Sequence, residues 1–474
     1  MKRKLYIRGE WRDGTEYAEL TAPYSGAKIA EIPQAAREDV HEAVQAAKLA
    51  ALEMKEMPAH KRAAILGQLV KQLQERREEL AQIIALEAGK PLKAALGEVD
   101  RTIATYIFAQ EEAKRIHGET IPLDAAPGGE GRISYTVRNP IGVVAAITPF
   151  NFPANLVAHK VGPAIAAGNT VVLKPASQTP LSAFMLAEML DKTDLPKGAF
   201  NVLTGKGSVV GEELVRHPDV AGITFTGSPD VGIEMKQKAG LKRITLELGA
   251  NSAVIVDQET ELTKELIQRI VWGSYVNNGQ VCVSVQRVYV HESIYSSFKQ
   301  LFAEEAKKLV IGDSLSEETD ISALISTKDV NRIDNWVQAA VGQGANIVLG
   351  GKRWNERIYE PTILENVNEK MEICCKEIFG PVVVLQAFDD FQDALSLVNQ
   401  SRYGLQAGVF TNNLAHAMEA AKKLEVGGVM INDVPTFRVD HMPYGGVKES
   451  GFGREGIKYA IEEMTELKLV TFKL

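Results

Sequence analysis

Apolar and polar positions alternate along the chain with two different periods. Residues 59–117 repeat apolar side chains at three- and four-residue steps between charged ones, which predicts amphipathic helices. From Val143 to residue 248, short apolar runs alternate with helical segments, as in "VVAAIT", "TVVLK" and "GITFTG". Crossovers of this length between strands are typical of a parallel, doubly wound sheet. We expect the N-terminal helices to cover that sheet.

A second alternating region follows Gly249 and predicts another α/β domain. Its apolar runs include "SAVIVD", "RVYVH", "VVVLQAF", "GLQAGVFT" and "GGVMIND". Two further segments are remote from both predicted cores. They are the polar stretch over residues 122–140, which has the pattern of an exposed hairpin, and the last run "LKLVTFKL". Strands placed in this way can complete a sheet on a neighbouring subunit.

The composition is that of a globular protein with more than one domain. The chain has 474 residues, of which 45% are hydrophobic, and this exceeds one ordinary core. A formal net charge of −8 without a basic stripe argues against nucleic-acid binding. No apolar run approaches membrane-spanning length, and no signal-peptide core follows the basic N-terminal residues. We expect a cytoplasmic protein that binds neither nucleic acid nor membrane.

The three cysteines do not form a structural pattern. Cys282 stands alone and Cys374 adjoins Cys375, so there is neither a disulfide framework nor a CxxC metal motif. The eight histidines show no HxxxH pair, and we predict no metal site. We interpret Cys374 and Cys375 as partly buried small residues, because nothing nearby indicates a lowered pKa.

Glycine-rich turns follow two of the predicted strands in the first region. "TGKGSVVGEEL" contains Gly207 and Gly211, and "FTGSPDVG" contains Gly227 and Ser228. Such turns expose backbone N–H groups at a helix N-terminus and leave room for a pyrophosphate. Neither matches GxGxxG, so a tight turn alone is the better explanation of each one. Two such junctions on one sheet edge make a nucleotide site and plain tight turns equally good explanations.

Polar side chains end or follow three strands. Lys174 ends "VVLK", where it can either bind ribose hydroxyls or simply be solvated. Asn151 in "TPFNFP" can either donate to an oxyanion or shape a turn. Glu247 in "TLELGAN" is an apolar-strand carboxylate that can serve as a general base or pair with a cation.

Cys282 lies in the polar turn "NNGQVCVSVQR". A buried free cysteine is usually inert packing, but the polar turn argues for a nucleophile, which needs an N–H donor for the oxyanion and a base for a later water step.

Seven motifs, taken in order, resemble the NAD(P)-dependent aldehyde dehydrogenase superfamily over nearly the whole chain. They are "TPFNFP", "VVLKPAS", "FTGSPDVG", "TLELGAN", "GQVCVSVQR", "EIFGPV" and "PYGGVKESGFGREG". The pattern is nearest to lactaldehyde, sulfolactaldehyde and non-phosphorylating glyceraldehyde-3-phosphate dehydrogenases. The resemblance implies that Cys282 attacks the aldehyde, that Asn151 and the Cys282 N–H hold the oxyanion, and that Glu247 activates water.

The resemblance also implies a domain plan and a set of cofactor contacts. Residues 1–121 and 141–248 would form the NAD(P)-binding domain, residues 249–457 the catalytic domain, and residues 122–140 with 458–474 a bridging sheet of a homodimer or homotetramer. The implied cofactor residues are Lys174, Ser177, Gly207, Gly211, Phe225, Gly227, Ser228, Glu377 and Phe379.

Two departures from the family pattern bear on specificity. NAD-restricted members commonly carry a glutamate where this chain has Ser177, so we expect NADP to be accepted and favoured over NAD. Many relatives carry a bulky aromatic at the position of His159, which suggests a short, polar substrate here. The implied substrate-binding residues are Arg101, Phe152, His159 and Arg438. The two arginines suit a phosphate or sulfonate, although each can instead form a structural salt bridge.

Rival interpretations remain open at this stage. Val281 replaces an arginine found in glyceraldehyde-3-phosphate relatives, which weakens the phosphate interpretation. A succinate-semialdehyde or broad-specificity enzyme is the main alternative. A CoA-acylating enzyme is disfavoured by Glu247, and a non-catalytic binding protein by the retained Cys282, Glu247, Asn151 and Lys174. A cofactor-free cysteine hydrolase lacks a histidine partner in any motif.

Overall fold

The N-terminal half is built on an eight-stranded sheet. The computed structural model describes residues 1–474, and the strand order in this sheet is β2-β1-β8-β7-β6-β9-β10-β20. The central strands β8, β7, β6, β9 and β10 are parallel, and the edges are antiparallel. The strands are β1 (Leu5–Ile7), β2 (Glu10–Arg12), β6 (Val143–Ile147), β7 (Thr170–Lys174), β8 (Phe200–Val202), β9 (Val220–Thr226), β10 (Arg243–Glu247) and β20 (Gly451–Phe452).

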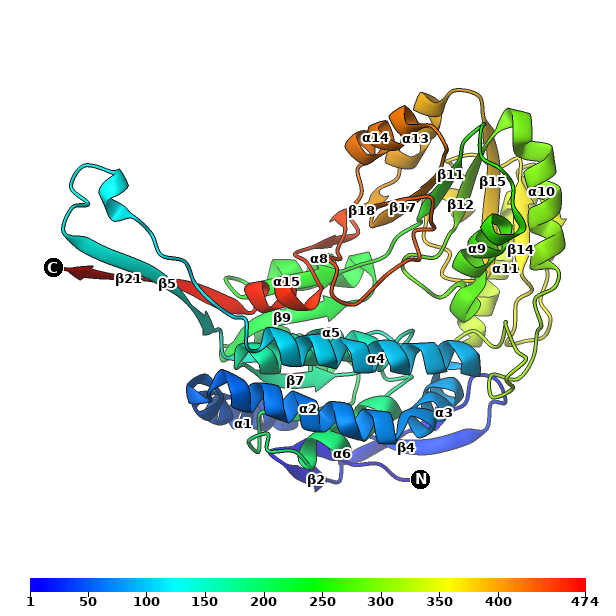
Figure 1. The fold of residues 1–474 in the computed structure, drawn as a ribbon. Coiled ribbons are helices and arrows are strands. Elements are labelled where there is room, and N and C mark those ends of the chain that lie inside the picture. The colour runs from blue at the N-terminus through cyan, green and yellow to red at the C-terminus, as the bar shows by residue number, and fades with distance from the viewer.

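Helices cover both faces of this sheet, as its alternating pattern predicts (Figure 1). The helical stretch expected over 59–117 contains three helices, and the longest of them, α4, packs on α5. Gly162 of α5 allows this close approach, because a Cβ there would lie 3.1 Å from the Ala109 side chain. The helices are α1 (Arg37–Glu56), α2 (Ala59–Glu75), α3 (Arg77–Ala88), α4 (Leu92–Glu112), α5 (Asn155–Ala167), α6 (Leu181–Asp191), α7 (Glu212–Arg216), α8 (Pro229–Lys238) and α15 (Ile457–Glu463).

The eight-stranded sheet and its helices form a first α/β layer. The second α/β layer is built on residues 253–431 and contains a seven-stranded sheet in the order β13-β14-β15-β12-β11-β17-β18. Only the edge strand β13 is antiparallel. Its strands are β11 (Ala253–Val256), β12 (Arg287–His291), β13 (Asn346–Leu349), β14 (Thr362–Glu365), β15 (Val382–Phe388), β17 (Gln406–Phe410) and β18 (Gly428–Ile431). Its helices are α9 (Lys264–Tyr275), α10 (Glu292–Ala306), α11 (Thr327–Gly342), α12 (Glu372–Cys375), α13 (Phe391–Asn399) and α14 (Leu414–Lys423).

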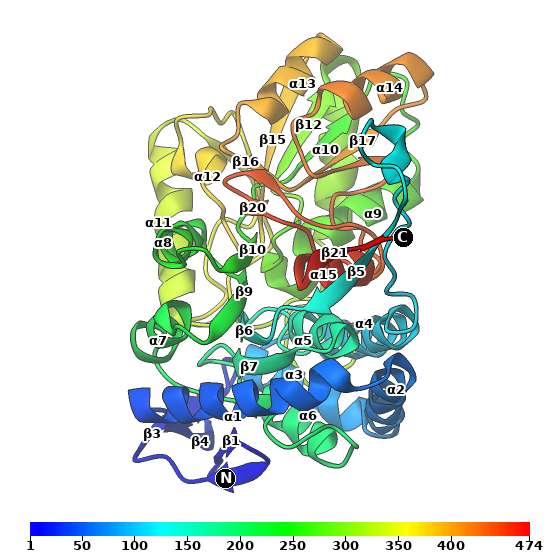
Figure 2. The same ribbon diagram turned by 90° about the vertical axis from the view of Figure 1, so that its left-hand side faces the viewer.

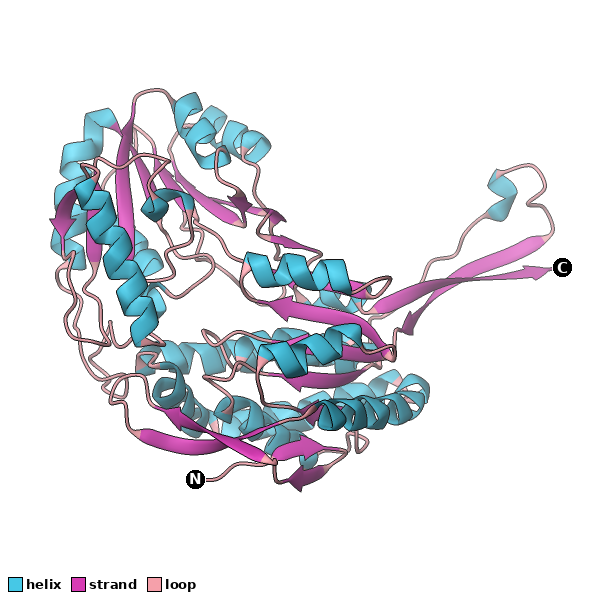
Figure 3. Cartoon of the chain, turned by 180° about the vertical axis from the view of Figure 1, so that it is seen from behind, coloured by secondary structure: helices cyan, strands magenta, loops and turns pink.

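A two-stranded antiparallel ribbon stands away from both layers (Figures 1 and 3). It pairs β5 (Arg132–Pro140) with β21 (Thr465–Lys473), and its apolar side chains Ile133, Leu467 and Leu469 are exposed. The helix α15 packs on α4 and α5, so the ribbon begins at Thr465 rather than at residue 458. A bridging role for this ribbon stays a prediction.

The α/β fold class predicted from the alternating pattern is confirmed. Two features escaped the pattern: the edge strands β1 and β2, and a separate hairpin of β3 (Glu16–Thr21) with β4 (Lys28–Gln34). No helix of the structure has the length and apolar character needed to cross a membrane. The chain between β18 and α15 returns from the second layer to the first and contributes β20, which pairs with β10 (Figure 2). This return places C-terminal residues between the two layers.

Candidate active site

The turn that carries Cys282 has an unusual backbone. Asn277, Asn278 and Gly279 are all left-handed, with φ values of 53°, 60° and 70°. Asparagine tolerates this region better than most residues, and a Cβ at Gly279 would collide with the Gly380 carbonyl. The Asn278 side chain donates to the Ala323 carbonyl at 3.0 Å and accepts from the Ser322 N–H at 2.7 Å. The polar residues noted in the sequence therefore hold the turn in shape.

Cys282 is partly buried, and its neighbours include groups that raise the pKa of its thiol and groups that lower it. Burial raises the pKa of its thiol to about 11, opposed by a hydrogen bond with Tyr444 and by the positive charge of Arg438. Glu377 and Glu247 add to the increase. Because these groups all influence one sulfur, residues from four separate segments meet at this point.

Asn151 is held against the cysteine turn. Its Nδ2 donates to the Gln280 carbonyl at 3.0 Å, and Asn277 donates to the Asn151 carbonyl at 3.1 Å. An amide nitrogen carries two N–H groups, so one remains for a further acceptor. The Asn151 Oδ1 is buried without a partner.

Glu247 ends β10 with a carboxylate that has no hydrogen-bond partner. Both of its oxygens are buried. Burial, with a contribution from the nearby Glu455 charge, raises the Glu247 pKa well above its ordinary value. A carboxyl group of this kind can take a proton from water near neutral pH.

A buried charge cluster, which motif reasoning did not single out, lies beside Glu247. Glu455 contacts the Lys160 Nζ at 2.7 Å and the Arg438 Nη2 at 3.1 Å. Burial opposes ionisation of Glu455, but the two cations outweigh it and lower its pKa to about 2. The signals in the sequence were present but weak: Glu455 belongs to the "GREG" motif, and Lys160 follows His159 on α5.

Asp440 contacts two of the residues expected to bind substrate, Arg101 and His159. Its carboxylate accepts from Arg101 at 2.7 Å, from His159 Nε2 at 2.9 Å and from Asn155 at 3.1 Å. Burial opposes ionisation of Asp440, yet His159 and Arg101 hold its pKa far below the usual range. Burial, followed by the Arg438 charge, lowers the pKa of His159. The salt-bridge alternative considered for Arg101 is therefore present in the structure.

Arg438 and Phe152, the other two residues expected to bind substrate, each take part in a contact between a cation and an aromatic ring. The Arg438 guanidinium lies over the Tyr444 ring, 3.6 Å from its centroid, and its Nε is buried without a hydrogen-bond partner. The Lys90 ammonium lies over the Phe152 ring, 3.8 Å from its centroid. Lys90 also forms a fully buried ion pair with Glu98.

The strand ends on the other side of the site fit a dinucleotide. Lys174 at the end of β7 is 6% exposed, and burial lowers its pKa to about 8. Its ammonium donates only to the Pro175 carbonyl at 3.3 Å, which leaves two N–H groups for a ligand such as a ribose. Gly211 lies beside it, since a Cβ there would be 3.9 Å from the Lys174 stem, while Gly207 has open space in front of it.

The turn after β9 has the features of a pyrophosphate site. Ser228 precedes α8 without capping it through its side chain, so its hydroxyl is free at a helix N-terminus. The Gly227 N–H donates to the Glu247 carbonyl at 3.0 Å. The Phe225 ring is 5% exposed and packs directly behind Gly227, where any Cβ would collide with it. Phe225 therefore supports the turn from the core side.

Glu377 and Phe379 lie between the buried charge cluster and the strand ends that fit a dinucleotide. The Glu377 carboxylate accepts from the Ala250 N–H at 3.0 Å, and burial raises its pKa to about 7. Gly249 has no room for a Cβ against this carboxylate. Phe379 has a φ of 49°, and its ring meets Phe150 edge-on at 5.7 Å. Glu377 keeps one oxygen without a partner for a ligand hydroxyl.

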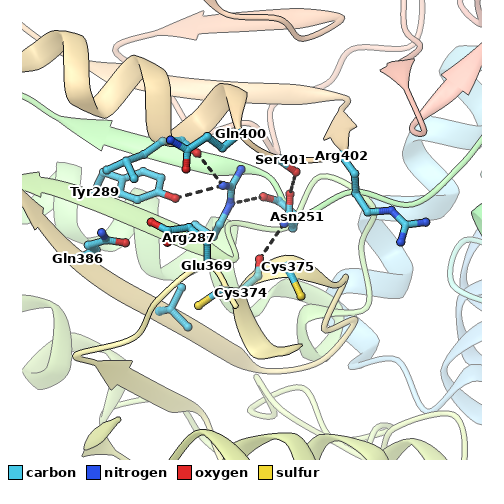
Figure 4. A pocket seen from close by; sticks show the side chains of 12 residues that line it. Asn251, Arg287, Tyr289, Glu369, Cys374, Cys375, Gln386, Gln400, Ser401 and Arg402 are labelled. Atoms are coloured by element: carbon cyan, nitrogen blue, oxygen red, sulfur yellow. Dashed lines mark hydrogen bonds between the residues drawn. The ribbon is translucent and has the colours of Figure 1, made fainter. Parts of the chain in front are cut away.

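A separate cavity of about 180 Å³ lies in the second α/β layer, around Arg287 (Figure 4). Cys374 and Cys375 of α12 line it. Cys374 is buried, and burial raises its pKa to about 12, in agreement with its interpretation as a packed residue. Cys375 differs from that interpretation because it is exposed. None of the residues proposed to act on an aldehyde lines this cavity.

The fold and the site are those of an NAD(P)-dependent oxidoreductase, with a cysteine between strand ends that fit a dinucleotide and a buried charge cluster. The chain belongs to the aldehyde dehydrogenase family, whose model matches residues 11–470.

Three similar proteins show how this chain relates to others. The 3-sulfolactaldehyde dehydrogenase of Priestia aryabhattai is 50% identical over 99% of this chain and 98% of its own. The structure of aldehyde dehydrogenase 21 from Physcomitrella patens, in complex with the reaction product succinate, has a TM-score of 0.97 and 42% identity, covering 100% of this chain and 98% of that one. Glyceraldehyde-3-phosphate dehydrogenase GapN of Methanocaldococcus jannaschii, complexed with NADP, has a TM-score of 0.93 and 41% identity, covering 97% of this chain and 100% of that one. The family and activity class expected from the seven motifs are confirmed.

Proposed function

We propose that the protein oxidises a short, polar hydroxyaldehyde to its carboxylic acid, with NADP as the favoured cofactor. The favoured substrate is of the sulfolactaldehyde type, which has an anionic tail, and lactaldehyde is its neutral relative. The observation that carries the substrate class is the charge balance of the pocket. Three cations, Lys160, Arg438 and Arg101, face the two ionised carboxylates of Glu455 and Asp440. While the raised pKa of Glu247 keeps that carboxyl group protonated, one positive charge of this set remains for a substrate anion.

Two atoms without partners support this substrate. The Arg438 Nε is a buried donor that suits a sulfonate or carboxylate oxygen. When His159 donates Nε2–H to Asp440, its Nδ1 becomes an acceptor, and this atom is buried without a partner. A substrate hydroxyl would satisfy it. A buried polar atom without a hydrogen bond is costly, so both atoms favour a polar ligand over an apolar one.

The reaction follows from the positions of Cys282, Asn151 and Glu247. The Cys282 sulfur bonds to the carbonyl carbon while the π-electron pair moves to oxygen, where the Cys282 N–H and the Asn151 amide donate. When bound, the cofactor supplies the hydride acceptor that converts the thiohemiacetal to a thioester. Glu247 then takes a proton from water as the water attacks the thioester, and the acid and the free cysteine are released.

The preference for NADP rests on the loop beside Lys174. Ser177 is exposed and donates to the Gly205 carbonyl at 3.1 Å, so no carboxylate at this position repels a 2′-phosphate. Lys206, which follows Gly205, is exposed and brings a cation to the same loop. The NADP complex of GapN is consistent with this preference.

Succinate semialdehyde is the second candidate substrate. It too ends in an anion, and the similar aldehyde dehydrogenase 21 is described with succinate as its reaction product. The two candidates differ in the hydroxyl next to the aldehyde, which only the lactaldehyde type could offer to His159.

Initial rates of NADPH and NADH formation with a small panel test the proposal. The panel contains sulfolactaldehyde, lactaldehyde, succinate semialdehyde, glyceraldehyde 3-phosphate and an apolar aldehyde of similar length. We expect the highest kcat/KM for sulfolactaldehyde with NADP, and a lower value for lactaldehyde, which has the hydroxyl but no anion. A higher value for the apolar aldehyde with NAD would overturn the proposed specificity and leave the family assignment intact.

A further inference from the structure

The Tyr444 hydroxyl is the one side-chain group that is hydrogen-bonded to the Cys282 sulfur. The oxygen lies 3.0 Å from Sγ. Tyr444 is 3% exposed and packs with Ala250, Val281 and Val283 around the cysteine. The tyrosine is therefore buried, while the sulfur is only partly buried.

The tyrosine is fixed from two directions. Its backbone N–H donates to the Glu455 carbonyl at 3.0 Å, and the Glu455 N–H donates back at 2.7 Å, so the two residues form a bridge. The Arg438 guanidinium covers one face of the ring, 3.6 Å from its centroid. A cation over a phenol ring attracts its electrons and makes the O–H a stronger donor.

The direction of this hydrogen bond changes with the charge on the sulfur. When Cys282 is a neutral thiol, either group can donate. When the sulfur is a thiolate, only the phenol can. Burial, and after it the neighbouring cysteine, raises the Tyr444 pKa well above its ordinary value, so the phenol keeps its proton.

We propose that Tyr444 is a catalytic residue whose hydroxyl donates to the Cys282 sulfur each time that sulfur carries negative charge. The first occasion is the free thiolate before it attacks the aldehyde. The second is thioester hydrolysis, in which the C–S bond breaks and its electron pair returns to sulfur. The phenol donates a hydrogen bond in both states and transfers no proton, so no further reactant is needed.

The benefit to the enzyme is a larger thiolate population in a site that disfavours charge. Burial raises the pKa of Cys282, and the Tyr444 hydrogen bond opposes this increase. A hydrogen bond to a charged group is strong enough to move a thiol pKa by about one to two. Loss of the hydroxyl should therefore reduce the thiolate fraction at pH 7 about 10- to 100-fold.

The inference rests on the proposed role of Cys282, and the test keeps the two separate. The rate of Cys282 alkylation by iodoacetamide is measured by peptide mass spectrometry between pH 6 and 9, without aldehyde. Exposed Cys375 lies on another tryptic peptide and serves as an internal reference. Turnover of Cys282→Ala is measured separately, and an active variant would remove the proposed mechanism itself.

Two substitutions at position 444 move the donor in opposite directions. Tyr444→Phe keeps the ring under Arg438 and should slow alkylation about 3- to 10-fold at pH 7, because the smaller amount of thiolate that remains is more basic and therefore more nucleophilic. Incorporation of 3-fluorotyrosine keeps the hydroxyl, makes it a stronger donor, and should speed alkylation above the wild-type rate. Tyr106→Phe is the matched control, because Tyr106 is fully buried and its hydroxyl has no partner. It should react at the wild-type rate.

The outcomes separate a donor from a packing residue. Slower reaction for phenylalanine together with faster reaction for fluorotyrosine supports the proposal. A wild-type rate for Tyr444→Phe overturns it, and so does a decrease in both variants, which would mean that shape alone matters. If a thermal melt shows Tyr444→Phe to be unfolded, the fluorotyrosine rate decides: an increase supports the donor and no increase overturns it.

Discussion

The cofactor side and the substrate side of the site are formed by different kinds of groups. On the cofactor side, Lys174 and Ser228 stand at strand and helix ends with free donors, and glycines leave the space in front of them. On the substrate side, Arg438, Glu455 and Lys160 form a buried ion cluster. Backbone geometry therefore shapes one side and side-chain charge shapes the other.

This difference determines how each side can change. A ligand held by backbone N–H groups and glycine turns depends on the fold, so the cofactor site varies little with individual side chains. Removal of one member of a buried ion pair strands the other and typically costs about 3–5 kcal/mol. Specificity on the substrate side should therefore change through sets of residues rather than one at a time.

Cys282→Ala is expected to have the largest effect and to separate the two sides completely. Loss of the nucleophile should lower kcat by at least about 10⁴-fold. NADP binding, measured by isothermal titration, should stay within a factor of about two because the dinucleotide edge is unchanged. Retained turnover would contradict the assignment of the nucleophile, and lost binding would contradict the independence of the two sides.

Glu247→Gln should have the next largest effect. Removal of a general base typically costs 10²–10⁴-fold in rate, which is about the loss we expect in thioester hydrolysis. The wild-type rate should rise with pH through the raised pKa of Glu247, because only the carboxylate accepts a proton. The glutamine variant should lose this pH dependence and accumulate the acyl-enzyme, which intact-mass spectrometry detects. Unchanged turnover would count against the base.

Arg438→Met tests the charged side alone. It removes the unpaired donor and the surplus positive charge but leaves Lys160 paired with Glu455. The kcat/KM for a sulfonated or carboxylated aldehyde should fall about 10- to 100-fold. An apolar aldehyde of the same length should lose much less. An equal decrease for both substrates would show that Arg438 acts through Cys282, Tyr444 or packing rather than on the substrate anion.

Ser177→Glu should give the smallest effect, confined to the cofactor side. A carboxylate at this exposed position should raise KM for NADP about tenfold by repelling the 2′-phosphate. The KM for NAD should be nearly unchanged. Gln178→Glu adds the same charge one residue away and serves as the control. Equal effects of the two variants would show that net charge rather than position matters.

The strands, helices and individual motif residues were predictable from local pattern. Val143 to Glu247 alternates as expected. The polar turn of Cys282 was visible in the sequence too, and the role of this cysteine stays a prediction. The partnership of residues far apart in the chain was not predictable. Glu455 meets Lys160 across 295 positions, and Asp440 meets Arg101 across 339. Periodicity carries no information about such pairs, because only the packed fold brings the charges together.

The partners of Arg101 and Tyr444 show the same limit. Arginine suits an anionic substrate and an internal carboxylate equally well, and only the position of Asp440 reveals which one is present. Tyr444 was part of a quoted motif, but a tyrosine beside glycines does not predict a contact with a sulfur 162 positions away.

The return of the chain from the second layer to the first has a consequence for biosynthesis. The strand β20, Arg438 and Glu455 all lie more than 150 residues after Cys282 and β10, so a ribosome releases them later than both. Until then, β10 has an open edge and Glu247 lacks the neighbours that shield it from water. N-terminal domains generally fold first during translation. The nascent enzyme should therefore carry its nucleophile and its cofactor edge well before it has a working base, and a prematurely terminated chain should bind dinucleotide without oxidising aldehydes.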